Sequence, residues 1–239
     1  MPANALAVVQ ARTSSTRLPG KVLADVEGEP MLALLLRRLA RAPSLRRIVV
    51  ATSDHPSDDA VEAVAGSVGV ATHRGPLEDV LSRYAGAADG HEGPIVRITG
   101  DCPLIDPALV EATLARFAGT PGALYGSNVA VRTYPDGLDV EVFSADALRL
   151  ADALATDPAD REHVTTIMRA RPDVFPAASL TGPEPLGEVR WTVDDQDDLD
   201  FIRAVVARLG AARYEASMHD VLAAVREPPA LGPPGGLRG

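Results

Sequence analysis

The sequence predicts a single α/β domain with a mostly parallel, mixed β-sheet flanked by helices. Short apolar runs of strand length alternate with helical segments of roughly 10–15 residues, as in chains built from β-α-β crossovers. The hydrophobic fraction of 46% and the charged fraction of 23% are those of an ordinary globular protein. The 239 residues contain no internal repeat and no interdomain linker. We therefore expect one domain over 1–226 and a Pro- and Gly-rich, disordered tail at 227–239.

Strands and helices alternate through the first half of the chain. The apolar run Ala5–Gln10 predicts a buried strand, and Pro30 suits the first position of a helix whose leucines share one face. The Ile- and Val-rich residues 47–52 predict a second strand, after which Ser57 can cap an amphipathic helix. A further helical stripe, a third strand and a helix opened by proline follow at 77–84, at 94–99 and from Pro107 onward.

The second half is less regular. Apolar and charged residues alternate at 138–143 and again at 188–193. This alternation predicts two half-exposed strands, at an antiparallel edge or on a sheet face that meets a ligand. Helices with the usual period follow at 197–209 and 217–225.

Charge and cysteine content argue against several classes of protein. The chain carries 33 acidic and 23 basic residues, a net charge of −10, so we expect no nucleic-acid partner and no binding to an anionic membrane. The single cysteine, Cys102, excludes an internal disulfide framework and agrees with a reducing compartment. The N-terminus lacks the pattern of a signal peptide, and no apolar run is long enough to span a membrane. We expect a cytoplasmic protein.

The loop after the first strand is the first candidate site. Residues 10–21, Gln-Ala-Arg-Thr-Ser-Ser-Thr-Arg-Leu-Pro-Gly-Lys, contain three cations, four hydroxyls and a Pro-Gly turn. Open α/β sheets bind ligands at the carboxyl ends of their strands, where backbone N–H groups can approach a polyphosphate and cations neutralise its charge. The Walker pattern is missing, because Ser15 and Val22 stand where it needs glycine and Ser or Thr. We interpret the loop as an anion site rather than a solvated loop with incidental arginines.

Two carboxylates that follow predicted strands are candidate metal ligands. Asp101 comes directly after the third strand and projects from the carboxyl edge of the sheet, a common position for a Mg²⁺ ligand that bridges phosphates. Asp194 can be a second ligand, or it can simply favour the positive end of the helix that follows it. For Asp106 we prefer a structural role, as the cap of the helix opened by Pro107.

Two further segments carry polar groups whose roles the residues leave open. Asp139 and Glu141 lie on the acidic face of the strand at 138–143, and Arg161 and His163 lie at the start of a helix. Each pair can line a substrate pocket or can be surface and salt-bridge material. Cys102 has no adjacent histidine or cation in the sequence, so we expect a small buried residue rather than a nucleophile.

Five motifs, in order along the chain, together resemble one family. They are residues 10–21, 97–106, 134–143, 161–165 and 190–194. The set resembles the SpsF-like cytidylyltransferases of spore-coat polysaccharide synthesis, which are relatives of the sialic-acid and Kdo cytidylyltransferases. The resemblance runs from about residue 5 to 209. It implies a GT-A-like nucleotidyltransferase fold, CTP as co-substrate, Mg²⁺ as cofactor and a homodimer.

The resemblance also implies roles for individual residues. Arg12 and Lys21 hold the triphosphate and act in catalysis together with Asp101, while Asp101 and Asp194 hold the metal. The candidate nucleotide contacts are Ala11, Arg12, Thr13, Ser14, Ser15, Arg17, Lys21, Arg74 and Asp101, and the candidate acceptor contacts are Asp139, Glu141, Arg161 and His163. One position departs from the pattern: many sialic-acid cytidylyltransferases have glycine where Ser14 stands, so the loop's approach to the nucleotide is expected to differ.

The expected reaction is transfer of CMP from CTP to an oxygen of a small anionic acceptor, with release of pyrophosphate. The acceptor is a nonulosonic-type sugar acid or a phosphonate, and the motifs do not choose between them. Two alternatives stay open. One is a GT-A glycosyltransferase that consumes a nucleotide sugar, which the three cations of the loop disfavour. The other is a non-catalytic nucleotide-binding module that regulates a partner.

Overall fold

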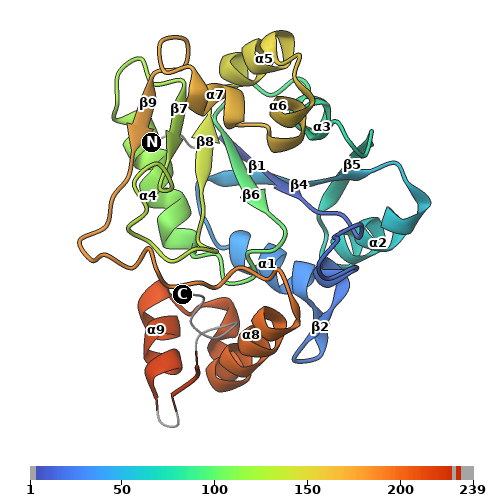
Figure 1. Cartoon of the computed structure of the whole chain (residues 1–239), viewed down its shortest axis with the longest axis vertical. Coiled ribbons are helices and arrows are strands. Elements are labelled where there is room, and N and C mark those ends of the chain that lie inside the picture. Colours follow the sequence, from blue (N-terminus) through green and yellow to red (C-terminus); the bar gives the residue numbers. More distant parts are fainter. Residues whose placement is uncertain (1–3, 228–229, 233–239) are drawn as a thin grey trace.

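A seven-stranded sheet forms the centre of the protein (Figure 1). The computed structural model describes residues 4–227 and 230–232. The strand order is β5-β4-β1-β6-β8-β7-β9. The strands are β1 (Ala5–Gln10), β4 (Leu45–Ser53), β5 (Ala71–Gly75), β6 (Ile95–Thr99), β7 (Tyr125–Ser127), β8 (Glu141–Phe143) and β9 (Ala177–Ser179). The first four pair in parallel, β8 is antiparallel to both neighbours, and β9 is parallel to β7. The predicted mostly parallel, mixed sheet is confirmed.

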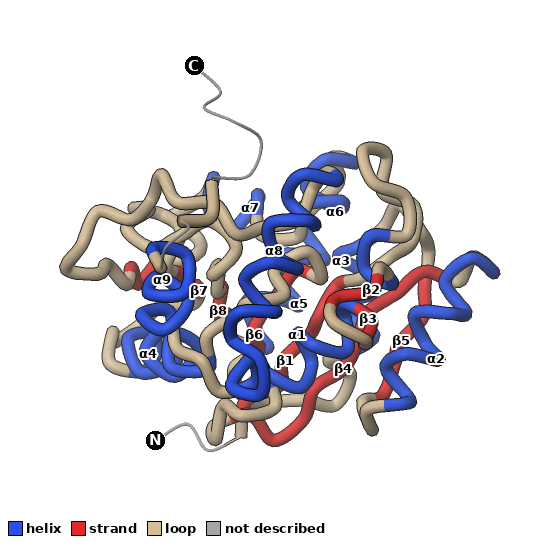
Figure 2. Tube along the Cα trace, turned by 90° about the horizontal axis from the view of Figure 1, so that it is seen from below, coloured by secondary structure: helices blue, strands red, loops and turns tan. Residues whose placement is uncertain are grey.

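Helices cover both faces of this sheet. They are α1 (Met31–Leu39), α2 (Asp59–Ser67), α3 (Val80–Ala87), α4 (Pro107–Ala118), α5 (Ala145–Leu154), α6 (Pro158–His163), α7 (Thr166–Ala170), α8 (Gln196–Leu209) and α9 (Met218–Arg226). One hydrophobic core joins the sheet to α1, α2, α4, α8 and α9, and a second core on the other face joins it to α3, α5 and α7. In the view of Figure 2, α4 and α9 lie at one end of the molecule and α2 at the other. A small hairpin, β2 (Asp25–Val26) and β3 (Glu29–Pro30), precedes α1.

The apolar run of β1 explains its central place. It pairs with β4 on one side and β6 on the other, and Ala5 to Val9 have no exposed surface. A strand that is covered on both faces reads as a continuous apolar run, whereas a half-exposed strand alternates. Parallel pairing brings the carboxyl ends of β1, β4 and β6 to the same edge of the sheet, and the polar loops after these strands meet there.

One predicted helix cap agrees with the structure and one does not. Asp106 accepts a hydrogen bond from the Ala108 amide at the start of α4, as expected. Ser57 was predicted to cap α2, and this is wrong, because Ser57 lies inside a short 3₁₀ turn, Pro56–Asp58, that precedes the helix. Pro56 begins the 3₁₀ turn two residues before the helix start that the apolar period of α2 predicts.

The two alternating segments of the second half differ from expectation. β8 begins only at Glu141, and it is an interior strand rather than an edge, so Glu141 is buried and not half-exposed. The segment 188–193 is not a ladder strand, and in the described chain Arg190 makes one isolated bridge, to Asp136. Trp191 and Val193 are nevertheless fully buried. Thr192 between them is buried as well, so the alternating residues belong to an extended segment that is buried at its end and has no strand partner along its length in the described chain.

In the C-terminal part of the chain, the described residues form two helices. α8 and α9 begin with capping boxes from Asp195 and Ser217, close to the predicted helix starts. The predicted tail at 227–239 lies outside the described residues except for 227 and 230–232. No helix in the described part of the chain is long and apolar enough to cross a membrane.

Candidate active site

A cavity of about 420 Å³ opens at the carboxyl ends of β1 and β6. Its walls come from the loop at 11–22, the turn at 99–102, the loop at 136–139 and the segment that leads into α8. Nine predicted site residues line it: Ala11, Arg12, Ser14, Ser15, Arg17, Lys21, Asp101, Asp139 and Asp194. Motifs that are more than 180 residues apart in the sequence therefore meet in one place. The edge is where an open α/β sheet is expected to bind its ligand.

The loop after β1 presents backbone donors to this cavity. Gly20 has a φ of 73°, the left-handed conformation that glycine adopts without steric cost, and its amide donates to the Thr13 carbonyl at 2.8 Å, which closes the loop. The backbone N–H groups of Arg12, Ser14, Thr16 and Arg17 make no hydrogen bond to any described residue. Free amides beside arginine side chains are suited to bind phosphate oxygens.

Lys21 links the two predicted metal ligands. Its Nζ donates to Asp101 Oδ2 at 2.9 Å and to Asp194 Oδ1 at 3.1 Å. A third hydrogen bond, 2.7 Å long, goes to the Val193 carbonyl. An ammonium group has three N–H donors, so all three are used. The lysine side chain is 11% exposed, and it acts in this state as the cation that holds the two carboxylates together.

Asp194 is the most heavily paired carboxylate of the cavity. Besides Lys21, it receives Arg17 at 2.9 Å on Oδ1 and Arg190 at 2.7 Å on Oδ2. Burial alone would raise the pKa of Asp194, but the hydrogen bonds from Arg190 and Lys21 outweigh it and hold the pKa below its usual range. Asp194 is therefore charged whenever the protein is folded near neutral pH.

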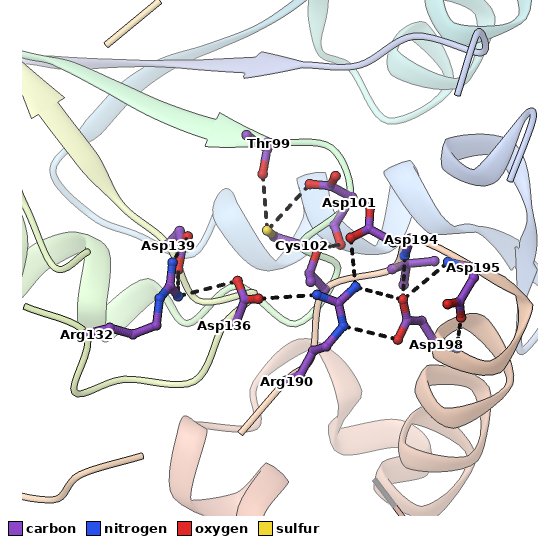
Figure 3. Close-up of polar contacts among 12 residues, drawn as sticks. Thr99, Asp101, Cys102, Arg132, Asp136, Asp139, Arg190, Asp194, Asp195 and Asp198 are labelled. Carbon is purple, nitrogen blue, oxygen red and sulfur yellow. Dashed lines mark hydrogen bonds and ion pairs between the residues drawn. The ribbon is translucent and has the colours of Figure 1, made fainter. Parts of the chain in front are cut away.

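Arginines and aspartates alternate along the opposite wall (Figure 3). Arg132 makes two hydrogen bonds to Asp139, at 2.8 and 2.9 Å, and a longer one to Asp136. Arg190 then joins Asp136 to Asp194, and it also contacts Asp198, which is buried at the start of α8. Burial, followed by the nearby charge of Asp139, raises the pKa of Asp136, so this carboxyl takes up a proton more readily than an aspartate in water.

The carboxylates suit a magnesium ion better than a structural metal. No cluster of three or more His, Cys, Asp or Glu side chains in the described residues can hold an ion. Mg²⁺ is commonly held by one or two carboxylates together with waters and substrate phosphates. Asp101 offers Oδ1, whose one polar neighbour among the described residues is the Cys102 thiol at 3.7 Å. Asp194 is the second carboxylate at this edge, and its Oδ1 is shared in this state between Lys21 and Arg17.

Cys102 is buried next to Asp101 at the floor of the cavity. Burial, followed by the charge of Asp101, raises the pKa of the thiol well above its usual value. Its Sγ lies 3.2 Å from the Thr99 hydroxyl (Figure 3). A thiol that stays protonated is a poor nucleophile, which agrees with the predicted role as a small buried residue.

One anchor of the loop was missed in the sequence. Asp58, 1% exposed, accepts hydrogen bonds from the amide and the hydroxyl of Thr13, at 2.8 and 2.7 Å, on Oδ1. Its Oδ2 accepts from the amide and hydroxyl of Ser53 at the end of β4. Thr13 thus fixes the loop and does not line the cavity. The signal was present, since polar residues follow β4 at the same sheet edge as those after β1 and β6.

Four other predicted site residues lie outside the cavity. Arg74, on β5, is paired with Asp59 and Glu62 on α2. Arg161, on α6, is paired with Asp79 and Asp152, and His163 is exposed at the end of the same helix. Glu141 is buried beside Arg97 within the sheet. Of the α6 residues, Glu162 comes near the cavity, through an ion pair of 3.4 Å with Arg12.

The sequence matches the family profile of cytidylyltransferases over residues 6–216. The chain belongs to the cytidylyltransferase family. It is 32% identical over 214 residues to the spore coat polysaccharide biosynthesis protein SpsF of Bacillus subtilis, which covers 86% of this chain and 87% of SpsF. A 3-deoxy-manno-octulosonate cytidylyltransferase of Trichlorobacter lovleyi is 36% identical over 123 residues, 51% of this chain and 48% of that protein. A solved cytidylyltransferase structure from Leptospira borgpetersenii superposes with a TM-score of 0.88 at 28% identity, covering 94% of both chains.

Family membership confirms the resemblance predicted from the five motifs. As a cytidylyltransferase, the protein is an enzyme, a CTP-dependent nucleotidyltransferase. This decides against the two alternatives that the sequence left open, a glycosyltransferase and a non-catalytic binding module. The cavity described above is lined by nine of the predicted site residues, so we assign it as the candidate active site.

Proposed function

We propose that the protein is a magnesium-dependent cytidylyltransferase that transfers CMP from CTP to a hydroxyl oxygen of a small sugar acid. The proposed acceptor is a sugar acid of the nonulosonic type, and a phosphonate is the alternative anionic acceptor. The observation that carries the proposal is one arrangement: a loop with free amides and cations faces Asp101 and Asp194 across a single cavity. One side suits a triphosphate and the other suits its metal ion.

The charge of the cavity supports the need for a metal. Four cations line it, Arg12, Arg17, Lys21 and Arg190, and four aspartates line it as well, Asp101, Asp136, Asp139 and Asp194. Each of these cations is paired with a carboxylate. A triphosphate brings about four further negative charges, which the walls do not compensate. Divalent cations that accompany the nucleotide restore the balance, as in other phosphate-transfer sites.

In the proposed reaction the acceptor hydroxyl oxygen attacks the α-phosphorus, and the bond from that phosphorus to the oxygen bridging to the β-phosphate breaks. The electron pair of the broken bond leaves on pyrophosphate, and the hydroxyl proton passes to solvent. The free amides of Ser14, Thr16 and Arg17 bind oxygens of the departing pyrophosphate, and Arg12 and Lys21 neutralise its charge. Asp101 and Asp194 hold Mg²⁺, which when bound neutralises charge on the phosphates. The protein contributes position and electrostatics rather than covalent chemistry.

The acceptor end of the cavity is assigned to the wall of Asp136, Asp139 and Arg190, with Arg132 paired to the two aspartates behind it. The sugar-acid class of the acceptor is supported by two relatives, one named for spore coat polysaccharide biosynthesis and one named as a 3-deoxy-manno-octulosonate cytidylyltransferase. An acidic acceptor needs a cation there. Arg190 can supply it, because its planar fork can bind a carboxylate in place of Asp136, whose raised pKa weakens its hold.

A pyrophosphate-release screen tests this function. The four nucleoside triphosphates are each incubated with a panel of sugar acids and phosphonates, with Mg²⁺ or with EDTA. We expect release with CTP, Mg²⁺ and a sugar acid together, and none when any one is omitted. Release with a phosphonate alone would move the acceptor to that class. Undiminished release in EDTA would contradict the metal. Analytical ultracentrifugation tests the homodimer that the family resemblance implies.

A further inference from the structure

Gln10 is the last residue of β1, and its side chain lines the cavity. It pairs in register with Thr99, two residues before Asp101, and lies two residues before Arg12. The side chain therefore sits between the phosphate loop and the metal-binding turn. None of the roles assigned above uses it.

A buried network fixes which end of the Gln10 amide faces the protein. Arg97 donates from one terminal nitrogen to Gln10 Oε1 at 3.1 Å, while its other terminal nitrogen is paired with Glu141. The Tyr84 hydroxyl lies 3.3 Å from the same oxygen. A guanidinium carries donors and no acceptor, so the atom facing it must be the amide oxygen and not the nitrogen.

The partners of Gln10 are themselves held rigidly. Glu141 and Tyr84 are buried, and the Tyr125 hydroxyl donates to the second oxygen of Glu141. Burial would raise the pKa of Glu141, but Arg97 and the hydroxyl of Tyr125 outweigh burial and lower it, so the ion pair persists. Arg97 consequently cannot rotate away without leaving a buried carboxylate unpaired, and this holds Gln10 in one orientation.

Because the oxygen faces inward, Nε2 faces the cavity. It makes no hydrogen bond to any described residue. We propose that this NH₂ group donates to the cytidine part of CTP, to a base acceptor atom or a ribose oxygen. The phosphates have their own donors in the loop amides and the arginines, whereas the nucleoside needs neutral donors. A side chain with a fixed donor beside a phosphate site supplies one. The inference rests on CTP as a substrate and is independent of which acceptor is used.

Binding measurements distinguish a contact to the nucleoside from a contact to the phosphates. The probes are CTP and inorganic tripolyphosphate, each titrated with Mg²⁺ by calorimetry. Gln10→Glu keeps an oxygen for Arg97 and replaces the outward donor by an acceptor. Gln10→Met removes the donor without adding charge. We expect both variants to bind CTP about 10- to 100-fold more weakly, since an unpaired polar group in the site is costly. Gln10→Met should bind tripolyphosphate as the wild type does.

A matched control is available on α8. Gln196 donates to Asp200 on the surface, so Gln196→Glu makes the same chemical change away from the cavity and should leave both affinities unchanged. Equal CTP affinity of Gln10→Met and the wild type would overturn the proposal, and so would an equal loss of CTP and tripolyphosphate affinity. Thermal unfolding of each variant shows whether the network still folds. Failure of the acceptor screen would leave these binding results unaffected, so the two proposals fail separately.

Discussion

Replacing Asp58 by asparagine should loosen the phosphate loop without touching the cavity. Asp58 accepts four hydrogen bonds, two from Thr13 and two from Ser53. Asparagine has only one side-chain oxygen, so the two donors that bind one of the Asp58 oxygens meet an NH₂ group instead. A hydrogen bond to a charged group contributes about 1.5–3 kcal/mol. Because Thr13 is half-exposed, we take the lower value for each of the two hydrogen bonds that are lost. Their loss then destabilises the fold by about 3 kcal/mol.

Thermal unfolding and CTP titration measure this effect. For a chain of this size, 3 kcal/mol corresponds to a Tm lower by roughly 6–12 °C. We expect CTP affinity to fall about tenfold as well, because the free amides of the loop are no longer held in place. Asp59→Asn is the matched control: the next residue in the chain is an exposed carboxylate paired with Arg74, and its loss should shift Tm far less.

The difference between Asp58→Asn and the wild type should depend on pH. Burial would raise the pKa of Asp58, but the hydrogen bonds from Ser53 and Thr13 outweigh it and lower the pKa. A carboxyl whose pKa is lower in the folded state contributes stability above the pKa of the unfolded chain, about 3.9. That contribution is lost as pH falls through the folded-state pKa. The Tm difference should therefore shrink below about pH 4. A difference that is absent at pH 7, or constant down to pH 3, would refute the reasoning.

Three further perturbations probe the site. Lys21→Arg should lower the rate of pyrophosphate release by about 10²–10³ while the fold stays intact, because three acceptors converge on one ammonium nitrogen; a full rate would contradict this. Asp101→Asn and Asp194→Asn should each abolish Mg²⁺-dependent release but keep a cooperative unfolding transition, whereas retained turnover in both would remove the metal assignment. Glu141→Gln should lower the free energy of unfolding by about 3–5 kcal/mol in urea, since it leaves Arg97, whose side chain is 15% exposed, without its counter-ion, while Asp146→Asn, at an exposed pair, should not move the midpoint.

The sequence predicted the sheet and most of the cavity for one shared reason. Residues 11–21 and Asp101 each follow an apolar run that fills the centre of a parallel sheet, and parallel strands end at one edge. Local sequence is then enough to place their loops together. Asp194 was predicted from a strand that the structure lacks, yet it lies in the cavity, directly after the extended segment in which Trp191 and Val193 are fully buried.

The remaining residues depended on pairings that no local pattern reports. Glu141 was a candidate acceptor contact from the family resemblance, and its alternating segment left a surface position open, but β8 is an interior strand whose second face is covered by α3, α5 and α7. The ion-pair partners of Arg161 are Asp79 and Asp152, which lie 82 and 9 residues away in the sequence. Gln10 was overlooked as an ordinary strand residue, since its orientation is set by Arg97 and Tyr84 from other elements. Side-chain partners of this kind are set by tertiary packing.

The ammonium of Lys21 has a consequence for how the enzyme can be handled. Two carboxylates that meet only around a metal ion would repel one another once the ion is removed, and their loops would separate. Here a covalently attached cation occupies the space between them at 2.9 and 3.1 Å. A chelator should therefore abolish turnover and leave the fold intact. A metal-free preparation should regain turnover as soon as Mg²⁺ returns, without a refolding delay.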